Sequence, residues 1–105
     1  MGLGDERCGA CDRNTPPLFE ADICALLEAL DPDWSVVGGR LVRTWRFPDF
    51  ASALRFVNEV GAVAEAEGHH PDLHLSWGRV RIEICTHAIG ALSRADFVLA
   101  AKLGR

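Results

Sequence analysis

The chain of 105 residues has no apolar run near the 20 residues that a membrane-spanning helix requires. It has one lysine, Lys102, against ten arginines, and its formal net charge is −4 at pH 7. Proteins that bind nucleic acid by neutralising phosphates carry the opposite charge. The first twelve residues are polar, so we expect no secretory signal peptide. These absences argue against a membrane-spanning protein and against direct binding to nucleic acid.

The chain has no second cysteine pair: of its four cysteines only Cys8 and Cys11 stand close together, as a C-x-x-C pair. A closed zinc site would need further ligands from elsewhere, and a redox motif of this spacing opens a helix after a strand. We therefore expect reduced thiols in a cytoplasmic protein. Cys24 and Cys85 are expected to be small core or face residues of a helix and a strand.

Residues 1–17 are predicted to form an irregular leader, because glycines and the pair Pro16-Pro17 interrupt any apolar periodicity. We expect this leader to be flexible or to pack on a neighbouring subunit. Residues 18–105 are predicted to form one domain, since a chain of this length makes a single hydrophobic core.

Hydrophobic spacing in that domain predicts the order α-β-β-α-β-β-α, a two-layer α+β fold. The first helix carries an apolar stripe of Phe19, Ile23, Leu26, Leu27 and Leu30, and the second a stripe of Phe50, Leu54, Val57, Val60 and Ala64. The predicted helices span about 18–30, 50–67 and 94–103, and the predicted strands span 34–37, 40–47, 73–77 and 80–87. Gly38-Gly39 is typical of a tight hairpin turn, and Asp49 of a helix N-cap.

All four histidines lie close together in the sequence, and three of them stand where predicted elements end. His69 and His70 follow the second helix, and His87 closes the last strand. Imidazole exchanges protons near neutral pH, so such a cluster favours general acid–base chemistry. Glu65 is one helical turn before His69 and is expected to orient its ring, and Asp96 is expected to do the same for His87.

A purely structural interpretation stands beside each of these residues. Asp96 occupies the third helical position of a capping box that starts at Ser93, and this needs no other function. Glu65 is also typical of a solvated helix surface, and His74 lies on the polar side of its strand. The histidines have no spacing typical of a metal site, so we expect no metal.

The segment from Glu65 to Asp96 follows a specific pattern: E-x-x-x-H-H-P, eight residues, V, five residues, T-H, and then L-S-x-x-D. It is matched without insertion or deletion, and further similarity extends back through Trp34 and the Gly38-Gly39 turn. In these residues the sequence resembles the pterin-4a-carbinolamine dehydratase family over about residues 18–103. The resemblance implies a four-stranded antiparallel sheet with three helices on one face, assembled as a homodimer or homotetramer.

The resemblance also implies an activity: dehydration of 4a-hydroxytetrahydropterin to quinonoid dihydropterin, which recycles the cofactor after aromatic amino-acid hydroxylation. It implies neither a metal nor an organic cofactor. By position, His69 and His87 match histidines expected to transfer protons, and His70 one expected to hold the pterin. Glu65 and Asp96 match positions that support the histidines, and Trp34 matches a tryptophan near the family's pocket, although core packing explains it equally well.

A different class of function stays open. Proteins that resemble the dehydratase also act as binding proteins, either as dimerisation cofactors of a transcription factor or as RuBisCO assembly factors in carbon-fixing bacteria. Such a role needs an exposed surface, and the acidic balance of the chain is compatible with a protein partner. The possible protein partners are therefore the aromatic amino-acid hydroxylase system and RuBisCO.

Overall fold

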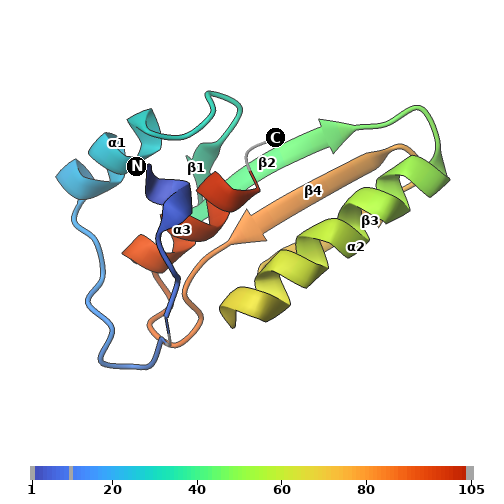
Figure 1. Ribbon diagram of the computed structural model, residues 1–105. Coiled ribbons are helices and arrows are strands. Elements are labelled where there is room, and N and C mark those ends of the chain that lie inside the picture. The colour runs from blue at the N-terminus through green and yellow to red at the C-terminus, as the bar shows by residue number, and fades with distance from the viewer. Residues whose placement is uncertain (1, 10, 104–105) are drawn as a thin grey trace.

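The computed structural model describes residues 2–9 and 11–103, and over these residues it confirms the predicted order of helices and strands. The helices are α1 (Glu20–Glu28), α2 (Phe50–Glu67) and α3 (Arg94–Lys102), and the strands are β1 (Ser35–Val37), β2 (Arg40–Arg46), β3 (Asp72–Ser76) and β4 (Arg79–Ile84). A short 3-10 helix, η1 (Leu3–Asp5), precedes them. The elements form a helical layer against one sheet (Figure 1).

The four strands form one antiparallel sheet in the order β1-β2-β4-β3. Gly38 and Gly39, with φ of 58° and 76°, make the turn between β1 and β2, as their sequence predicts. The central pairing sets Leu41 of β2 opposite Ile84 of β4, and the outer pairing sets Asp72 of β3 opposite Glu83. The start of β2 and the start of β3 therefore both lie beside the end of β4.

Alternation along the strands separates an apolar face from a polar one. The apolar face and α3 supply the fully buried core side chains: Leu41, Val80, Ile82, Ile84, Phe97 and Leu99. Arg43 also lies on the apolar face, buried, with its guanidinium 4.5 Å from the centroid of the Trp45 ring. The opposite face carries charged side chains from β2, β3 and β4, including Arg40, Asp72 and Glu83.

Helix α2 begins and ends where local signals predict. The Asp49 carboxylate accepts the backbone N–H of Ser52 at 2.7 Å, and Gly68 ends the helix with φ of 65°. The predicted apolar stripe is wrong at its start, because Phe50 and Leu54 remain 44% and 41% exposed. Val60 and Ala64 of the predicted stripe are buried, together with Ala53, which was not part of it, and α2 packs on β3 and β4. Among the described residues, no helix is both long and apolar enough to cross a membrane.

Helix α1 packs at the edge of the core through Ile23, Leu26 and Leu27. Phe19, predicted in its apolar stripe, is instead the N-cap residue and is 77% exposed. Of the two cysteines expected to be core or face residues, Cys24 is exposed on α1 and Cys85 is buried. A nine-residue helix has one narrow inward face, and neither Phe19 nor Cys24 lies on it.

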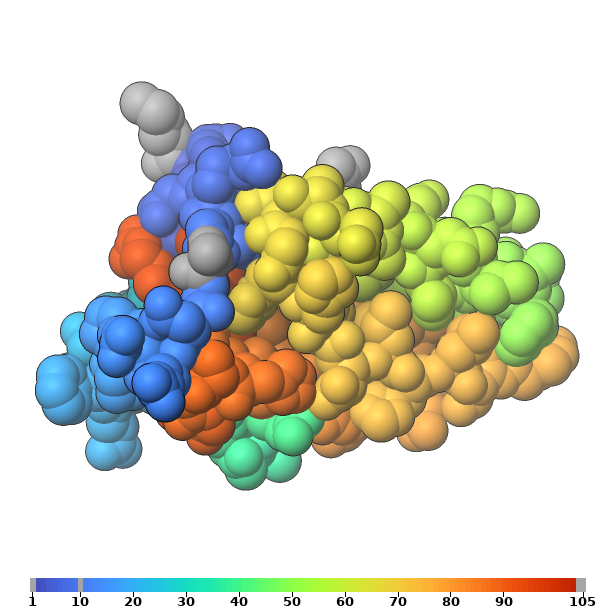
Figure 2. Space-filling view, turned by 90° about the horizontal axis from the view of Figure 1, so that it is seen from below, coloured from blue at the N-terminus to red at the C-terminus, as the bar shows by residue number. Residues whose placement is uncertain are grey.

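The described residues of the leader, which was expected to be flexible or to pack on a neighbouring subunit, contact other parts of their own chain. η1 contacts α3, and the Lys102 ammonium donates to the Gly4 carbonyl at 2.8 Å. Farther along, Arg94 forms two hydrogen bonds to the Glu6 carboxylate, at 2.9 and 2.6 Å. Figure 2 shows the blue leader lying against the yellow end of α2 and the orange-red segment before α3. These contacts place the leader beside the end of the sheet at which β4 ends.

Candidate functional site

The three predicted active-site histidines meet at one end of the sheet. His69 and His70 come just before β3, and His87 comes just after β4, which pairs with β3 in the antiparallel sense. A hollow of about 180 Å³ opens between them, lined by Cys11, Gly68, His69, His70, Cys85, Thr86, His87 and Ala88. Drug-sized ligands occupy pockets of roughly 300–1,000 Å³, so this open hollow suits one edge of a flat ring rather than a whole ligand.

His69 is the buried member of the group, with a side chain only 7% exposed. Its Nε2 lies 2.5 Å from Oδ1 of Asp96, which is fully buried. A carboxylate oxygen accepts hydrogen bonds, so Nε2 of His69 carries the proton and Nδ1 is the acceptor nitrogen of the neutral ring. The prediction that Asp96 serves His87 is wrong, because α3 places this carboxylate behind His69.

Asp96 also joins three elements. Its Oδ2 accepts the backbone N–H of Ser93 at 2.7 Å, which completes the predicted contact at the start of α3. The same oxygen accepts the hydroxyl of Thr86 at 2.8 Å, at the end of β4. A buried carboxylate is stable only when such donors replace its water. Asp96 therefore caps α3 and holds the His69 ring at the same time.

His70 has a different partner and a different environment. Its Nε2 lies 2.9 Å from Oε2 of Glu65, and the two side chains are 61% and 80% exposed. The expectation that Glu65 orients His69 is wrong: the carboxylate, on the last turns of α2, reaches the exposed ring of the next residue instead. A pair in contact with water to this extent orients a ring but adds little stability.

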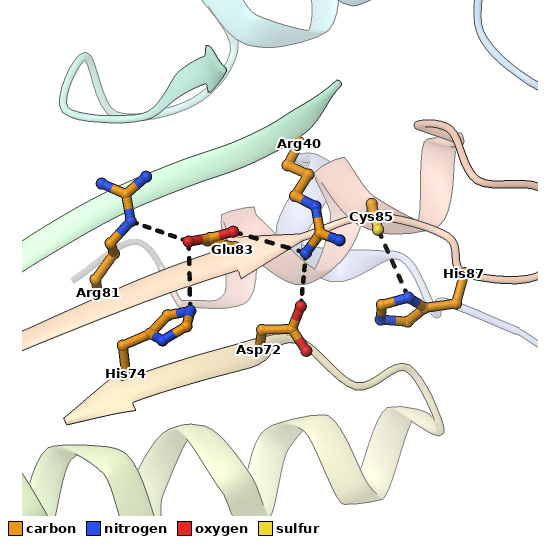
Figure 3. Close-up of polar contacts among 7 residues, drawn as sticks. All are labelled: Arg40, Asp72, His74, Arg81, Glu83, Cys85 and His87. Carbon is orange, nitrogen blue, oxygen red and sulfur yellow. Dashed lines mark hydrogen bonds and ion pairs between the residues drawn. The ribbon is translucent and has the colours of Figure 1, made fainter. Parts of the chain in front are cut away.

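His87 is exposed and contacts a thiol. Its Nδ1 lies 3.8 Å from Sγ of Cys85, which is buried (Figure 3). Over residues 2–9 and 11–103, no group of three or more His, Cys, Asp and Glu side chains is arranged to hold a metal ion. Each of the three histidine rings thus has its own hydrogen-bonding partner, and the described residues do not bring the rings together as ligands of one metal ion.

A charged cluster lies beside the hollow on the polar face of the sheet (Figure 3). Arg40 lies 2.6 Å from the Asp72 carboxylate and 3.6 Å from that of Glu83. Glu83 also contacts Arg81 at 3.0 Å and His74 at 3.3 Å. The prediction that His74 is a surface residue of a polar strand position is confirmed, since its side chain is 53% exposed.

Trp34 is the predicted site residue that lies apart from the hollow. It is 3% exposed and packs edge to face against Trp45, with ring centroids 5.6 Å apart. The residues that share a surface depression with it are on α1 and the following loop, among them Cys24 and Leu27. Its position in this structure favours the packing interpretation that the sequence left open.

Two cysteines that line the hollow, Cys11 and Cys85, were not predicted as site residues from the sequence. Cys85 stands two positions before His87, and residues at that spacing share one face of a strand, so alternation alone could have paired them. Cys11 lines the hollow because the leader is held against α2, where the Cys8 backbone N–H donates to the Glu67 carboxylate at 3.0 Å. Burial and the nearby Glu67 carboxylate raise the pKa of the Cys8 thiol to about 11. No local pattern in the leader encodes this docking.

Comparison with known proteins gives a consistent result. The family described as pterin 4 alpha carbinolamine dehydratase matches residues 16–105. Two relatives carry the name "Putative pterin-4-alpha-carbinolamine dehydratase". The one from Chlorobium limicola is 50% identical, over 92% of this chain and 88% of its own length. The one from Rickettsia bellii is 44% identical, over 96% of this chain and 90% of its own length. A Brucella melitensis structure, titled a transcriptional coactivator/pterin dehydratase, has a TM-score of 0.78 at 29% identity, covering 84% of this chain and 95% of its own.

A more distant structure is a pterin dehydratase-like protein described as a RuBisCO assembly factor of the alpha-carboxysome. It has a TM-score of 0.54 at 20% identity and covers 67% of this chain and 81% of its own, so it shows a shared fold alone. The fold and the hollow define a small α+β protein with a histidine-lined site at one end of its sheet. With the family matched over nearly its whole length, the chain belongs to the pterin-4a-carbinolamine dehydratase family.

Proposed function

We propose that this protein dehydrates 4a-hydroxytetrahydropterin to quinonoid dihydropterin. The observation that carries the proposal is the meeting of His69, His70 and His87 around one hollow, with a separate partner for each ring. Family membership and the names of the relatives support the same reaction class. The substrate would come from an aromatic amino-acid hydroxylase, and the free thiols are compatible with the cytoplasm.

The reaction requires two proton movements. The bond from C4a to the hydroxyl oxygen breaks with its electron pair on oxygen, so a proton must reach that oxygen for water to leave. A ring nitrogen of the pterin must lose a proton, and its electrons form the new double bond to C4a. One imidazole can give the first proton while another takes the second, which is general acid–base catalysis. We assign these steps to His69 and His87.

His70 is assigned to binding. Its ring is held by Glu65 at 2.9 Å through Nε2, which leaves Nδ1 as the acceptor nitrogen of the neutral ring. Such a nitrogen can accept a hydrogen bond from an N–H of a pterin. Because His70 and Glu65 are both exposed, we expect this contact to affect substrate binding more than the proton transfers.

The test is an assay of quinonoid dihydropterin formation with purified protein, against the spontaneous rate. We expect His69→Ala and His87→Ala to lower the catalysed rate at least about a hundredfold, the usual effect of removing a general acid or base. His74→Ala is the matched control, because His74 is exposed and contacts Glu83 outside the hollow. A wild-type rate equal to the spontaneous rate would overturn the proposal.

A second candidate function is protein binding, favoured by apolar side chains left exposed on α2. Phe50 and Leu54 stand one turn apart there and are 44% and 41% exposed. The Brucella melitensis protein is titled a transcriptional coactivator as well as a dehydratase. We propose that this face of α2 meets a second copy of the chain in a homodimer or homotetramer, and a RuBisCO or transcription-factor partner stays an alternative occupant.

A further inference from the structure

The exposed ring of His87 is held by a buried thiol. Sγ of Cys85 lies 3.8 Å from Nδ1 of His87, within the range of a sulfur hydrogen bond (Figure 3). In the part of the chain that the structure describes, this thiol is the hydrogen-bonding partner of the His87 ring. Both residues line the same hollow. The backbone is fixed on either side, because Thr86 pairs with Ala91 and the His87 carbonyl accepts the N–H of Gly90 at 3.3 Å.

The state of the thiol decides which way the hydrogen bond runs. Burial is the largest influence and raises the pKa of Cys85 above its ordinary value. The carboxylates of Asp96, Asp72 and Glu83 raise this pKa further, while the guanidinium of Arg40 opposes them. Cys85 therefore keeps its proton at neutral pH and can donate it, and Nδ1 of His87 is the acceptor.

We propose that Cys85 is the positioning residue of His87, donating its S–H to Nδ1 and so leaving the ring proton on Nε2. This inference rests on the proposed function only for its kinetic consequence. With its proton on Nε2, the neutral His87 ring presents an N–H that can donate a hydrogen bond to the oxygen of a departing hydroxyl. His69, whose Nε2–H is engaged by Asp96, offers Nδ1 as the acceptor. The two partners thus leave His87 with a donor nitrogen, Nε2, and His69 with an acceptor nitrogen, Nδ1.

Two substitutions separate the hydrogen bond from the volume of the thiol. Cys85→Ser keeps a donor at nearly the same place, whereas Cys85→Val fills the space without a donor. Cys24→Ser is the matched control for losing a cysteine, because Cys24 is exposed on α1. Thermal unfolding of each variant reports whether the fold persists, and the dispersed NMR spectrum reports it independently.

The first measurement does not depend on activity. Long-range ¹H–¹⁵N correlation of the full chain, at a pH where His87 is neutral, reports the hydrogen bonding of each ring nitrogen. We expect the Nδ1 resonance of His87 to show a hydrogen-bonded acceptor in the wild type, in Cys85→Ser and in Cys24→Ser. In Cys85→Val it should move to the value of a free acceptor. An unchanged Nδ1 resonance in folded Cys85→Val would overturn the proposal.

The second measurement is the dehydratase assay on the same proteins. Loss of one neutral hydrogen bond predicts a roughly three- to tenfold lower kcat for Cys85→Val, with KM little changed and with rescue by Cys85→Ser. Equal kinetics for folded Cys85→Val and wild type would also overturn it. Should the wild type show no dehydratase activity, the proposed function fails while the NMR result still decides whether Cys85 positions His87.

Discussion

His69 and Asp96 are separated by 27 positions in the sequence, yet Nε2 of the histidine and Oδ1 of the carboxylate lie 2.5 Å apart in the protein interior. The other oxygen of Asp96 accepts from Ser93 and Thr86. One carboxylate therefore starts α3, fastens the end of β4 and orients a histidine of the candidate site. The Asp96 carboxylate therefore contributes both to the stability of the fold and to the orientation of His69.

We predict that Asp96→Asn destabilises the fold by about 2 kcal/mol or more, which lowers Tm by roughly 10 °C in a domain of this size. The Asn side chain has one oxygen and one NH₂ group in place of two carboxylate oxygens. At least one of the three donors, from His69, Thr86 and Ser93, would then face the NH₂ group, which is itself a donor. Thermal unfolding followed by circular dichroism measures the change.

Asp22→Asn is the control for that substitution. Asp22 accepts the N-cap N–H of α1 at 3.2 Å just as Asp96 does for α3, but on the exposed surface. We expect a loss below about 1 kcal/mol there, because water can replace an exposed cap. Equal losses at Asp22 and Asp96 would show that capping alone accounts for the buried carboxylate.

For Glu65→Gln we predict almost unchanged stability, within about 0.5 kcal/mol, because the pair with His70 is largely exposed to water. The effect should fall on pterin binding, as a severalfold higher KM with little change in kcat. Steady-state kinetics and an unfolding curve measured side by side separate the two quantities. A large fall in kcat would instead place His70 among the proton-transfer groups.

The leader should detach in acid. Hydrogen bonds from Arg94 to Glu6, and from the Cys8 backbone to Glu67, lower the pKa of both carboxyls below 4.5. A depressed carboxyl pKa stabilises the docked leader above the ordinary value and loses that effect as pH falls through the folded pKa. Hydrogen exchange of the Cys8 amide should be protected evenly above about pH 5 and lose protection below pH 4.

Glu67→Gln supplies the control for the leader, since its amide oxygen still accepts from Cys8 but does not titrate. In this variant the protection of the Cys8 amide should depend less on pH over the same range. If wild type and Glu67→Gln lost protection at the same pH, another group would have to fasten the leader.

The exposed face of α2 leads to a prediction about assembly. If Phe50 and Leu54 meet a second copy of the chain, the double variant Phe50→Ser/Leu54→Ser should lower the molar mass measured by light scattering after size-exclusion chromatography. Phe19→Ser is the control, because Phe19 is more exposed, at 77%, and stands at the start of α1. A smaller mass for the control alone would move the interface to α1.

Much of the fold was predictable because its signals are local. Gly38-Gly39, Asp49 and the alternation of Val80, Ile82 and Ile84 each fix a turn, a cap or a buried face within a few residues. The exposure of Phe50 was not predictable, because the phase of an apolar stripe on α2 depends on how the helix sits on β3 and β4.

The candidate site was predictable in its members and not in their pairing. His69, His70 and His87 meet because antiparallel β3 and β4 bring their loops together, which follows from topology. That Asp96 reaches His69, and Glu65 reaches His70, depends on where α3 and the end of α2 lie in space. Spacing along the sequence carries no information about such contacts between elements.

The double duty of Asp96 changes how related sequences should be compared. A family member that had lost the reaction would still need this carboxylate to begin α3 and to hold Thr86, so selection for a folded chain alone would retain it. His87 is exposed, and among the described residues the hydrogen-bonding partner of its ring is Cys85. Loss of a histidine at that position, rather than of the aspartate, would mark a relative that kept the scaffold and gave up catalysis.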